Sequence, residues 1–274
     1  MRKLLLFHII GLSICFGCSS SEINLFETDT SNSIHIDTLK NFKDFKNLIN
    51  CYPNFISKIS GNYIIWQDGT KMLIDDGIIN KNFDSLLNYP DFEDQFIFSY
   101  KPGKLIDFPI YNYDPGRIRY DPFFKKMYGE TKQEVEKNLV EIVWLPKTIN
   151  KRIRITSVNG INEKLQQISN ELDTLPNKFK KYLINIGGTF NWRNISGTQR
   201  LSAHSYGIAI DINANYSNYW RWDYTNNGKY VYKNQIPIKI VEIFEKHGFI
   251  WGGKWYHYDT MHFEYRPELF FNLK

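Results

Sequence analysis

Apolar and polar residues alternate in two segments near the C-terminus. Residues 208–212 (Ile-Ala-Ile-Asp-Ile) and 261–265 (Met-His-Phe-Glu-Tyr) both have the period of a β-strand. We therefore expect two strands, with Asp211 facing away from its isoleucine neighbours and with His262 and Glu264 on one face. Pairing of these strands would bring Asp211 and His262 to one point.

Helical spacing of apolar residues marks three further segments. Residues 131–143 predict a helix with Thr131 as its N-cap and Glu134 placed to complete a capping box. Residues 162–172 predict a second helix. Residues 237–248 predict the best-bounded helix, which opens with a proline and closes with a glycine after the last turn.

Shorter strands are expected between these helices. Residues 62–66 and 71–74 predict a hairpin around an Asp-Gly turn. Residues 249–251 predict a strand that follows the C-terminal helix. Residues 189–193 also alternate, which predicts a strand that would aim Arg193 into a cleft.

The first residues have the pattern of an export signal. A positively charged start is followed by an apolar run too short to span a bilayer as a helix, so we interpret residues 1–17 as a signal peptide. Gly17 precedes Cys18, as in bacterial lipoproteins, so lipidation of Cys18 is expected, with plain secretory cleavage as the alternative. Residues 18–40 would then be a polar, lipid-anchored tether. The protein is expected to be exported to the periplasm or cell envelope as a membrane-anchored lipoprotein.

Cysteine usage agrees with this interpretation. The chain has three cysteines, of which Cys15 would leave with the signal and Cys18 would carry lipid. Cys51 would remain alone and is expected to be buried and inert. No intrachain disulfide is then available, so stability must come from a core and from a metal if one binds.

Charge and composition narrow the function classes. Removal of residues 1–17 takes away Arg2 and Lys3 and no acid, so the formal charge falls from +5 to +3. This mild excess is spread along the chain and gives no case for nucleic-acid binding. With 7 Trp, 18 Tyr and 20 Phe, much of the aromatic content must be core, although Tyr and Trp also suit a groove for a polar polymer.

The length is compatible with one main folded unit and an N-terminal addition. We expect residues 41–150 to form an extension or subdomain packed on a catalytic domain of residues 151–274. A monomer is expected.

Two imidazoles and a carboxylate are the candidate metal ligands. His204, Asp211 and His262 offer three ligands and leave a fourth position open, which is the pattern of a catalytic zinc site. Asp259 lies three residues before His262 and is the candidate general base. Arg193 is the candidate for stabilising the transition state, with Arg200 as the alternative.

Each of these residues has a structural alternative. A lone histidine in a loop or strand is usually a surface or core residue, and Asp259 would then be a turn residue. Ser202 and Glu264 are candidates for orienting a ligand through a hydrogen bond, although Glu264 would equally suit a strand end in water. The groove candidates, for which packing is the alternative, include Trp255 and Tyr256.

Two other histidines are less suited to the metal. His247 sits where a helix end would favour it, and the odd offset between His257 and His262 points them to opposite faces of a strand.

At these residues the chain resembles the zinc D-alanyl-D-alanine carboxypeptidase and L-alanyl-D-glutamate endopeptidase family, the LAS-type peptidoglycan metallopeptidases that include VanY-like carboxypeptidases and phage endolysins. The family's motifs are Ser-x-His-x-x-Gly-x-Ala-x-Asp and a later acid-x-x-His. They occur here as Ser202 to Asp211 and Asp259 to His262. The resemblance covers about residues 185–270.

The resemblance implies one Zn²⁺ ion held by His204, Asp211 and His262, with Asp259 as the catalytic acid and base. It also implies an α+β fold in which a small antiparallel sheet, flanked by helices, carries the zinc site. Residues 114–119 also look like those of longer bacterial members.

The expected function is therefore hydrolysis of an amide bond in peptidoglycan stem peptides by metal-activated water. The bond would be that of a D,D-carboxypeptidase or of an L-Ala-D-Glu endopeptidase. The partners would be the stem peptide and, through the lipid anchor, the membrane. Two alternatives are a periplasmic D-Ala-D-Ala dipeptidase and a non-catalytic wall-binding lipoprotein.

Overall fold

The structure is a computed structural model that describes residues 45–103, 109–224 and 230–270. The expected signal peptide, the tether and Cys18 lie outside the described residues. Within these three stretches, no helix is long and apolar enough to cross a membrane.

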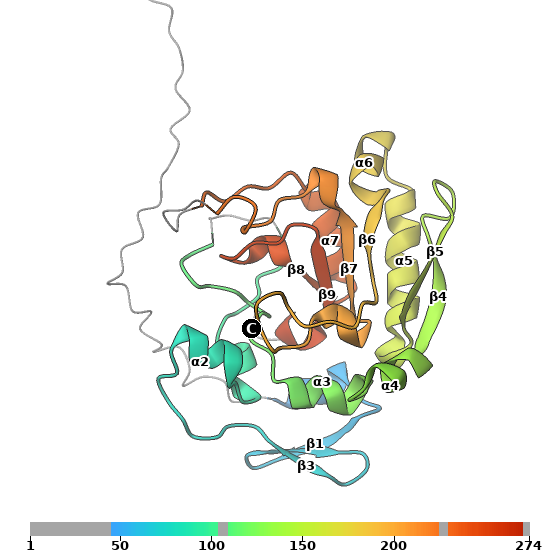
Figure 1. Cartoon of the computed structure of the whole chain (residues 1–274). Helices are drawn as coiled ribbons and strands as arrows, with labels where there is room; N and C mark the ends of the chain where they lie inside the picture. The colour runs from blue at the N-terminus through green and yellow to red at the C-terminus, as the bar shows by residue number, and fades with distance from the viewer. Residues whose placement is uncertain (1–44, 104–108, 225–229, 271–274) are drawn as a thin grey trace, which may run out of the picture.

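A four-stranded antiparallel sheet lies at the centre of the fold (Figure 1). Its strand order is β6-β7-β9-β8, so β7 and β9 are the inner pair. Their register sets Asp211 opposite His262, as the alternating pattern predicted. The strands are β6 (Ile186–Gly188), β7 (Ala209–Asn213), β8 (Phe249–Trp251) and β9 (His262–Tyr265).

Strand β9 is buried along its whole length. All four of its residues are buried, whereas β7 leaves only Asp211 partly exposed. On the side of α7 (Ile238–Lys246), the ring of Phe244 stacks on Phe263 with 3.9 Å between centroids. Because β9 is covered, its polar residues must find partners inside the protein. Glu264 therefore does not end a strand in water.

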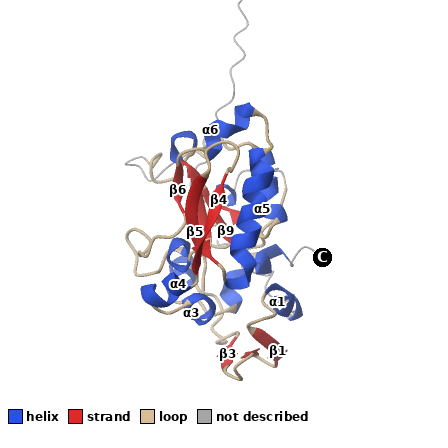
Figure 2. Ribbon diagram, turned by 90° about the vertical axis from the view of Figure 1, so that its right-hand side faces the viewer, coloured by secondary structure: helices blue, strands red, loops and turns tan. Residues whose placement is uncertain are grey.

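The predicted helices near 162–172 and 237–248 are confirmed. Helix α5 (Ile161–Asp173) contacts both α7 and a two-stranded ribbon, and Figures 1 and 2 show the ribbon beside the helix. Helix α7 begins after Pro237 as N-cap, and Gly248 follows it with φ of 84°. Glycine adopts this left-handed backbone without steric cost, which lets the chain turn directly into β8.

The helix predicted over residues 131–143 is only half correct. Helix α4 (Lys132–Lys137) forms with the expected capping box, but residues Leu139–Trp144 form strand β4. Strand β4 pairs along its whole length with β5 (Lys151–Thr156), and this ribbon packs on α5. Apolar positions at helical spacing also fit the alternation of a strand here, and the tertiary pairing decides between them.

The strand predicted over residues 189–193 is absent. Strand β6 ends at Gly188, and residues 189–193 continue as an irregular segment. Their backbone groups are used by the segment after Ser202 instead of by a neighbouring strand. The Thr189 carbonyl bonds the His204 ring, and the Arg193 N–H donates to Ser205 Oγ.

The N-terminal part contains a three-stranded antiparallel meander. The predicted hairpin of β2 and β3 is confirmed, and an additional strand, β1, pairs with β2. Short helices connect the meander to the rest of the chain. These elements are α1 (Lys46–Cys51), β1 (Ile56–Ser60), β2 (Tyr63–Trp66), β3 (Lys71–Leu73), α2 (Phe83–Asn88) and α3 (Asp121–Tyr128).

Residues from both parts of the chain share one hydrophobic core. The main cluster of buried residues runs from Leu48 to Leu269 and includes Cys51, which is buried as expected. Tyr52 donates a hydrogen bond to Glu268, 216 residues away. The fold is therefore mixed α+β with the N-terminal part packed against the sheet region.

The described residues also form one further short α-helix and several 3-10 helices. The α-helix is α6 (Lys180–Leu183). The 3-10 helices are η2 (Glu93–Phe96), η3 (Val158–Gly160), η4 (Asn177–Phe179), η5 (Ala203–Tyr206), η6 (Ala214–Tyr216), η7 (Gly252–Lys254) and η8 (Pro267–Phe270).

The capping box of α4 provides a test of the helix boundary. Thr131→Ala should lower the free energy of unfolding by about 1 kcal/mol, because a helix N–H loses its side-chain partner. Gln133→Ala, at an exposed position of the same helix, should change it by less than about 0.5 kcal/mol. Urea unfolding followed by circular dichroism measures both, and equal effects would contradict the cap.

Candidate metal centre

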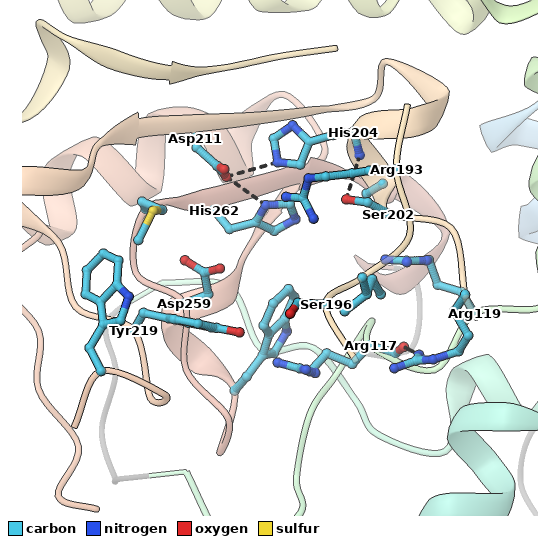
Figure 3. Close-up of a pocket in the computed structure, with 16 residues that line it drawn as sticks. Arg117, Arg119, Arg193, Ser196, Ser202, His204, Asp211, Tyr219, Asp259 and His262 are labelled. Carbon is cyan, nitrogen blue, oxygen red and sulfur yellow. Dashed lines mark hydrogen bonds and ion pairs between the residues drawn. The ribbon is translucent and has the colours of Figure 1, made fainter. Parts of the chain in front are cut away.

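Three predicted ligands meet at the inner strands. His204 comes from η5, Asp211 from β7 and His262 from β9, and one donor atom of each lies within 4.8 Å of the other two. Asp211 Oδ1 is 3.1 Å from His204 Nε2 and 2.9 Å from His262 Nδ1. Figure 3 shows the three side chains converging. Two imidazoles and a carboxylate are a donor set that suits zinc.

The second nitrogen of each imidazole is already occupied. His204 Nδ1 lies 2.7 Å from the Thr189 carbonyl, which can only accept, so the proton is on Nδ1 and the lone pair on Nε2. His204 Nε2 is buried and lies 3.1 Å from Asp211 Oδ1, but without the geometry of a hydrogen bond. His262 Nε2 lies 3.1 Å from Glu264 Oε2, which leaves Nδ1 facing Asp211. In its neutral form, each ring would keep its proton on the nitrogen bonded to Thr189 or Glu264 and offer the nitrogen that faces Asp211 to a metal.

The turn before β7 delivers His204 to the site. Ser202 is the N-cap of η5, and its Oγ accepts from the His204 N–H at 3.3 Å. Gly207 ends η5 with φ of 64°, and a Cβ there would lie 2.7 Å from a Leu139 methyl group. Only glycine combines this backbone with such close packing. The chain can therefore fold back so that His204 and Asp211 face each other.

Glu264 is the buried anchor of His262. It is fully buried, and Arg119 and Arg266 approach its two oxygens at 3.3 and 3.2 Å. Burial alone would raise its pKa, but Arg119, His262 and Arg266 outweigh burial and lower it to about 2. Glu264 is therefore ionised and orients the His262 ring through a hydrogen bond. Among the interactions of the described residues, Glu264 makes no contact with His204.

The two strand residues of the triad stabilise each other's charged forms. Burial raises the pKa of Asp211, but the neighbouring His204 and His262 lower it well below its usual range. Burial lowers the pKa of His262, but Asp211 and Glu264 raise it to about 10. A divalent cation would replace the His262 proton between the same groups, so metal binding must release a proton.

Asp259 lies beside the ligands with a free carboxylate oxygen. Its carbonyl accepts from the His262 N–H at 3.2 Å, which fixes it one turn before the ligand. Asp259 Oδ1 is buried and has no hydrogen-bond partner among the described residues. Burial and the charge of Asp211 raise the pKa of Asp259 to about 6. Figure 3 shows its carboxylate inside the same cleft as the triad.

The triad and Asp259 line a cleft of about 310 Å³. Arg193 is exposed and lines the cleft together with His204 and His262 (Figure 3). Its position in the cleft agrees with the prediction, although the segment that carries it is not a strand. Arg200 also lines the cleft and donates to the Arg117 carbonyl.

Two arginines in the cleft were missed by sequence reasoning. Arg117 and Arg119 precede α3 and lie across the cleft from Asp211 in Figure 3. They belong to the stretch 114–119, whose resemblance to longer bacterial family members was the available signal. Nothing in their spacing relates them to residues more than eighty positions later.

Of the two aromatic residues expected to line a substrate groove, one lines the cleft and the other lies outside the cleft lining. Trp255 lines the cleft, donates to the Pro115 carbonyl at 2.6 Å and lies under the Arg117 guanidinium. Contrary to expectation, Tyr256 is not part of the cleft lining; it packs on Tyr111 and Tyr230.

The two other histidines in the described part of the chain lie away from the triad. His257 bonds Asp114 through both its ring and its backbone N–H. His247 is the C-cap of α7 and bonds Glu171 at 2.7 Å. Neither residue lines the cleft.

Comparison with known proteins agrees with this geometry. Residues 196–265 match the family model described as D-alanyl-D-alanine carboxypeptidase. This segment contains the triad and Asp259, but it spans well under half of the chain. No curated protein matches the chain. The match supports a peptidase similar to this carboxypeptidase family.

Zinc binding tests the triad directly. His204→Ala should weaken zinc binding by more than the roughly 10–100-fold typical for loss of an outer partner, because it removes a ligand. A competition titration against a chromophoric chelator measures the affinity. His247→Ala, a histidine outside the cleft, should bind zinc as the native protein does. Equal losses in both variants would contradict the assignment.

Proposed function

We propose that this protein is a zinc-dependent peptidase that hydrolyses an amide bond in peptidoglycan stem peptides. The observation that carries the proposal is a triad of suitable ligands next to a carboxylate that has no structural partner for one oxygen among the described residues. The family match over residues 196–265 supports the substrate class. The bond would be that of a D,D-carboxypeptidase or of an L-Ala-D-Glu endopeptidase.

His204, Asp211 and His262 would hold the ion. Zinc at this position would polarise the scissile carbonyl and lower the pKa of a water molecule towards neutrality. Protein side chains would transfer the protons and stabilise the negative charge that develops on the carbonyl oxygen.

Asp259 is placed to move the protons. It would take one proton from the attacking water as the water oxygen bonds to the carbonyl carbon. It would then give that proton to the leaving nitrogen as the C–N bond breaks, which yields a carboxylate and an amine. A structural metal site would need no such residue and would usually close its fourth position with protein. The free Asp259 oxygen therefore favours an enzyme over a non-catalytic lipoprotein.

Arg193 is the better placed of the two candidate arginines for the developing negative charge. It lines the cleft together with the two histidines, and its guanidinium makes a long hydrogen bond of 3.4 Å to the Asn194 carbonyl. Arg200 is half-buried and bonded to the Arg117 carbonyl, so it is held in the wall of the cleft. Arg193 would thus donate to the carbonyl oxygen in the transition state.

The reaction and the base are tested together with muropeptides of defined stem. The zinc-loaded protein should release either D-Ala or the fragment ending at L-Ala, and mass spectrometry of the products identifies the bond. Asp259→Asn should keep zinc but lose about 10²- to 10⁴-fold in kcat, the usual contribution of a general acid or base. Asp68→Asn, in the β2–β3 turn, is the matched control. Full activity of the Asp259 variant would eliminate this residue as the base.

The pH profile should show an acidic limb due to Asp259. Its protonated form cannot accept a proton, so kcat/KM should rise with pH through its pKa. That pKa is about 6 without metal, and the charge of bound zinc favours the carboxylate, so the limb should lie at or below pH 6. Zinc content must be measured at each pH, because acid also protonates His262. A flat profile with zinc retained would contradict the role.

A further inference from the structure

A second hollow adjoins the cleft on the side away from the triad. It has a volume of about 600 Å³. It shares Arg117, Ile195 and Arg200 with the cleft, so the two spaces meet at a common wall. A chain that leaves the triad over these three residues would reach the hollow next.

The hollow is lined mainly by cationic and aromatic side chains. Arg117, Arg200 and Arg221 provide three guanidinium groups, whereas Asp84 is the one carboxylate in its described lining. The Nε atom of Arg200 is buried and lacks a hydrogen-bond partner within the described part of the chain. Burial, with Arg119 and Arg117 nearby, lowers the pKa of Arg200 to about 10, so it stays charged at neutral pH. Arg117 is paired with the buried Asp114 at 3.7 Å, so Asp84 and Asp114 together offset two of the three guanidinium groups. One positive charge remains in excess, and an anion in the hollow would balance it.

Much of the hollow lies outside the family-matched segment. Phe83 and Leu87 come from α2, and Tyr111 and Asn112 come from the loop before α3. These residues precede residues 196–265 by more than eighty positions. The N-terminal part of the chain therefore adds a binding surface to a site whose ligands come from the C-terminal part.

We propose that this hollow is a specificity subsite for a carboxylate-bearing stretch of the same substrate whose amide bond lies at the triad. The proposal rests on the proposed function and extends it. It implies a preference for long, anionic peptides over a free dipeptide, which is too short to reach both spaces. The guanidinium groups would bind the carboxylate, and Phe83 and Tyr111 would cover the chain beside it.

Two substitutions outside the triad cleft test the charge of the subsite. Asn112→Asp adds a carboxylate to the hollow without changing its shape, at a φ of 56° that both residues tolerate. Arg221→Glu reverses the charge of a residue that lines the hollow but not the triad cleft. The matched controls are Asn150→Asp, at an exposed position with φ of 49°, and Lys58→Glu, on exposed strand β1.

Binding is measured by calorimetry with full-length, zinc-loaded protein carrying Asp259→Asn, so that hydrolysis cannot interfere. The probes are two muropeptides that differ only in a free carboxylate or a carboxamide on the acidic residue of the stem. The free carboxylate should bind about tenfold more tightly, which is the scale of one charge pair near a surface. Asn112→Asp and Arg221→Glu should bring this ratio close to one, and the two controls should leave it unchanged.

The proposal is overturned if both probes bind equally to the otherwise unaltered protein, or if neither substitution changes the ratio. Binding that depends on the sugar part and not on the carboxylate would likewise overturn it. Thermal unfolding and zinc content verify that each variant is folded. If one of the two test variants does not fold, the other variant still provides the test. Absence of hydrolysis by the protein with Asp259 intact, alongside a carboxylate-dependent ratio, would instead reject the proposed reaction while the subsite stands.

Discussion

The antiparallel pairing of β7 and β9 is the constraint on which the candidate site depends. It sets Asp211 directly opposite His262 inside the protein, where unpaired polar groups are costly. The ring of His262 is consequently held between Asp211 and Glu264. Glu264 in turn requires Arg119 and Arg266, because a buried carboxylate needs charged partners. One register of two short strands therefore dictates a network that reaches well beyond the strands.

This network makes the N-terminal part a component of the site. Arg119 approaches Glu264 from residues before α3, and Arg266 continues to Glu268, which also accepts from Tyr52. The His262 imidazole is thus linked, through Glu264, Arg266 and Glu268, to Tyr52, the residue that caps the C-terminus of α1. The family-matched segment supplies the donor atoms, but the surroundings that keep them oriented come from the whole described chain.

Sequence alone predicted the elements whose local pattern and tertiary setting agree. The strand with Asp211, the helix ending before Gly248 and the capping box at Thr131 are examples. It misassigned residues 139–144, whose apolar spacing suits both a helix and a strand, until pairing with β5 selects the strand. Residues 189–193 alternate like a strand, but their backbone groups bond to side chains after Ser202. Contacts such as those of Arg117 depend on long-range packing and leave no local pattern.

The distribution of unsatisfied polar atoms separates function from stability in this protein. Among the described residues, seven buried side-chain atoms have no hydrogen-bond partner. Four of them belong to residues that line the cleft, namely His204, Asp259, Arg119 and Arg200, whereas those of Tyr206, Trp220 and Arg266 lie outside its lining. Each such atom costs free energy in the folded protein, so folding alone gives no reason to gather them. A bound cation would give a partner to the imidazole nitrogen and the carboxylate oxygen. Anionic oxygens of a ligand would give partners to the guanidinium nitrogens. A metal ion with an acidic peptide has this combination of charges.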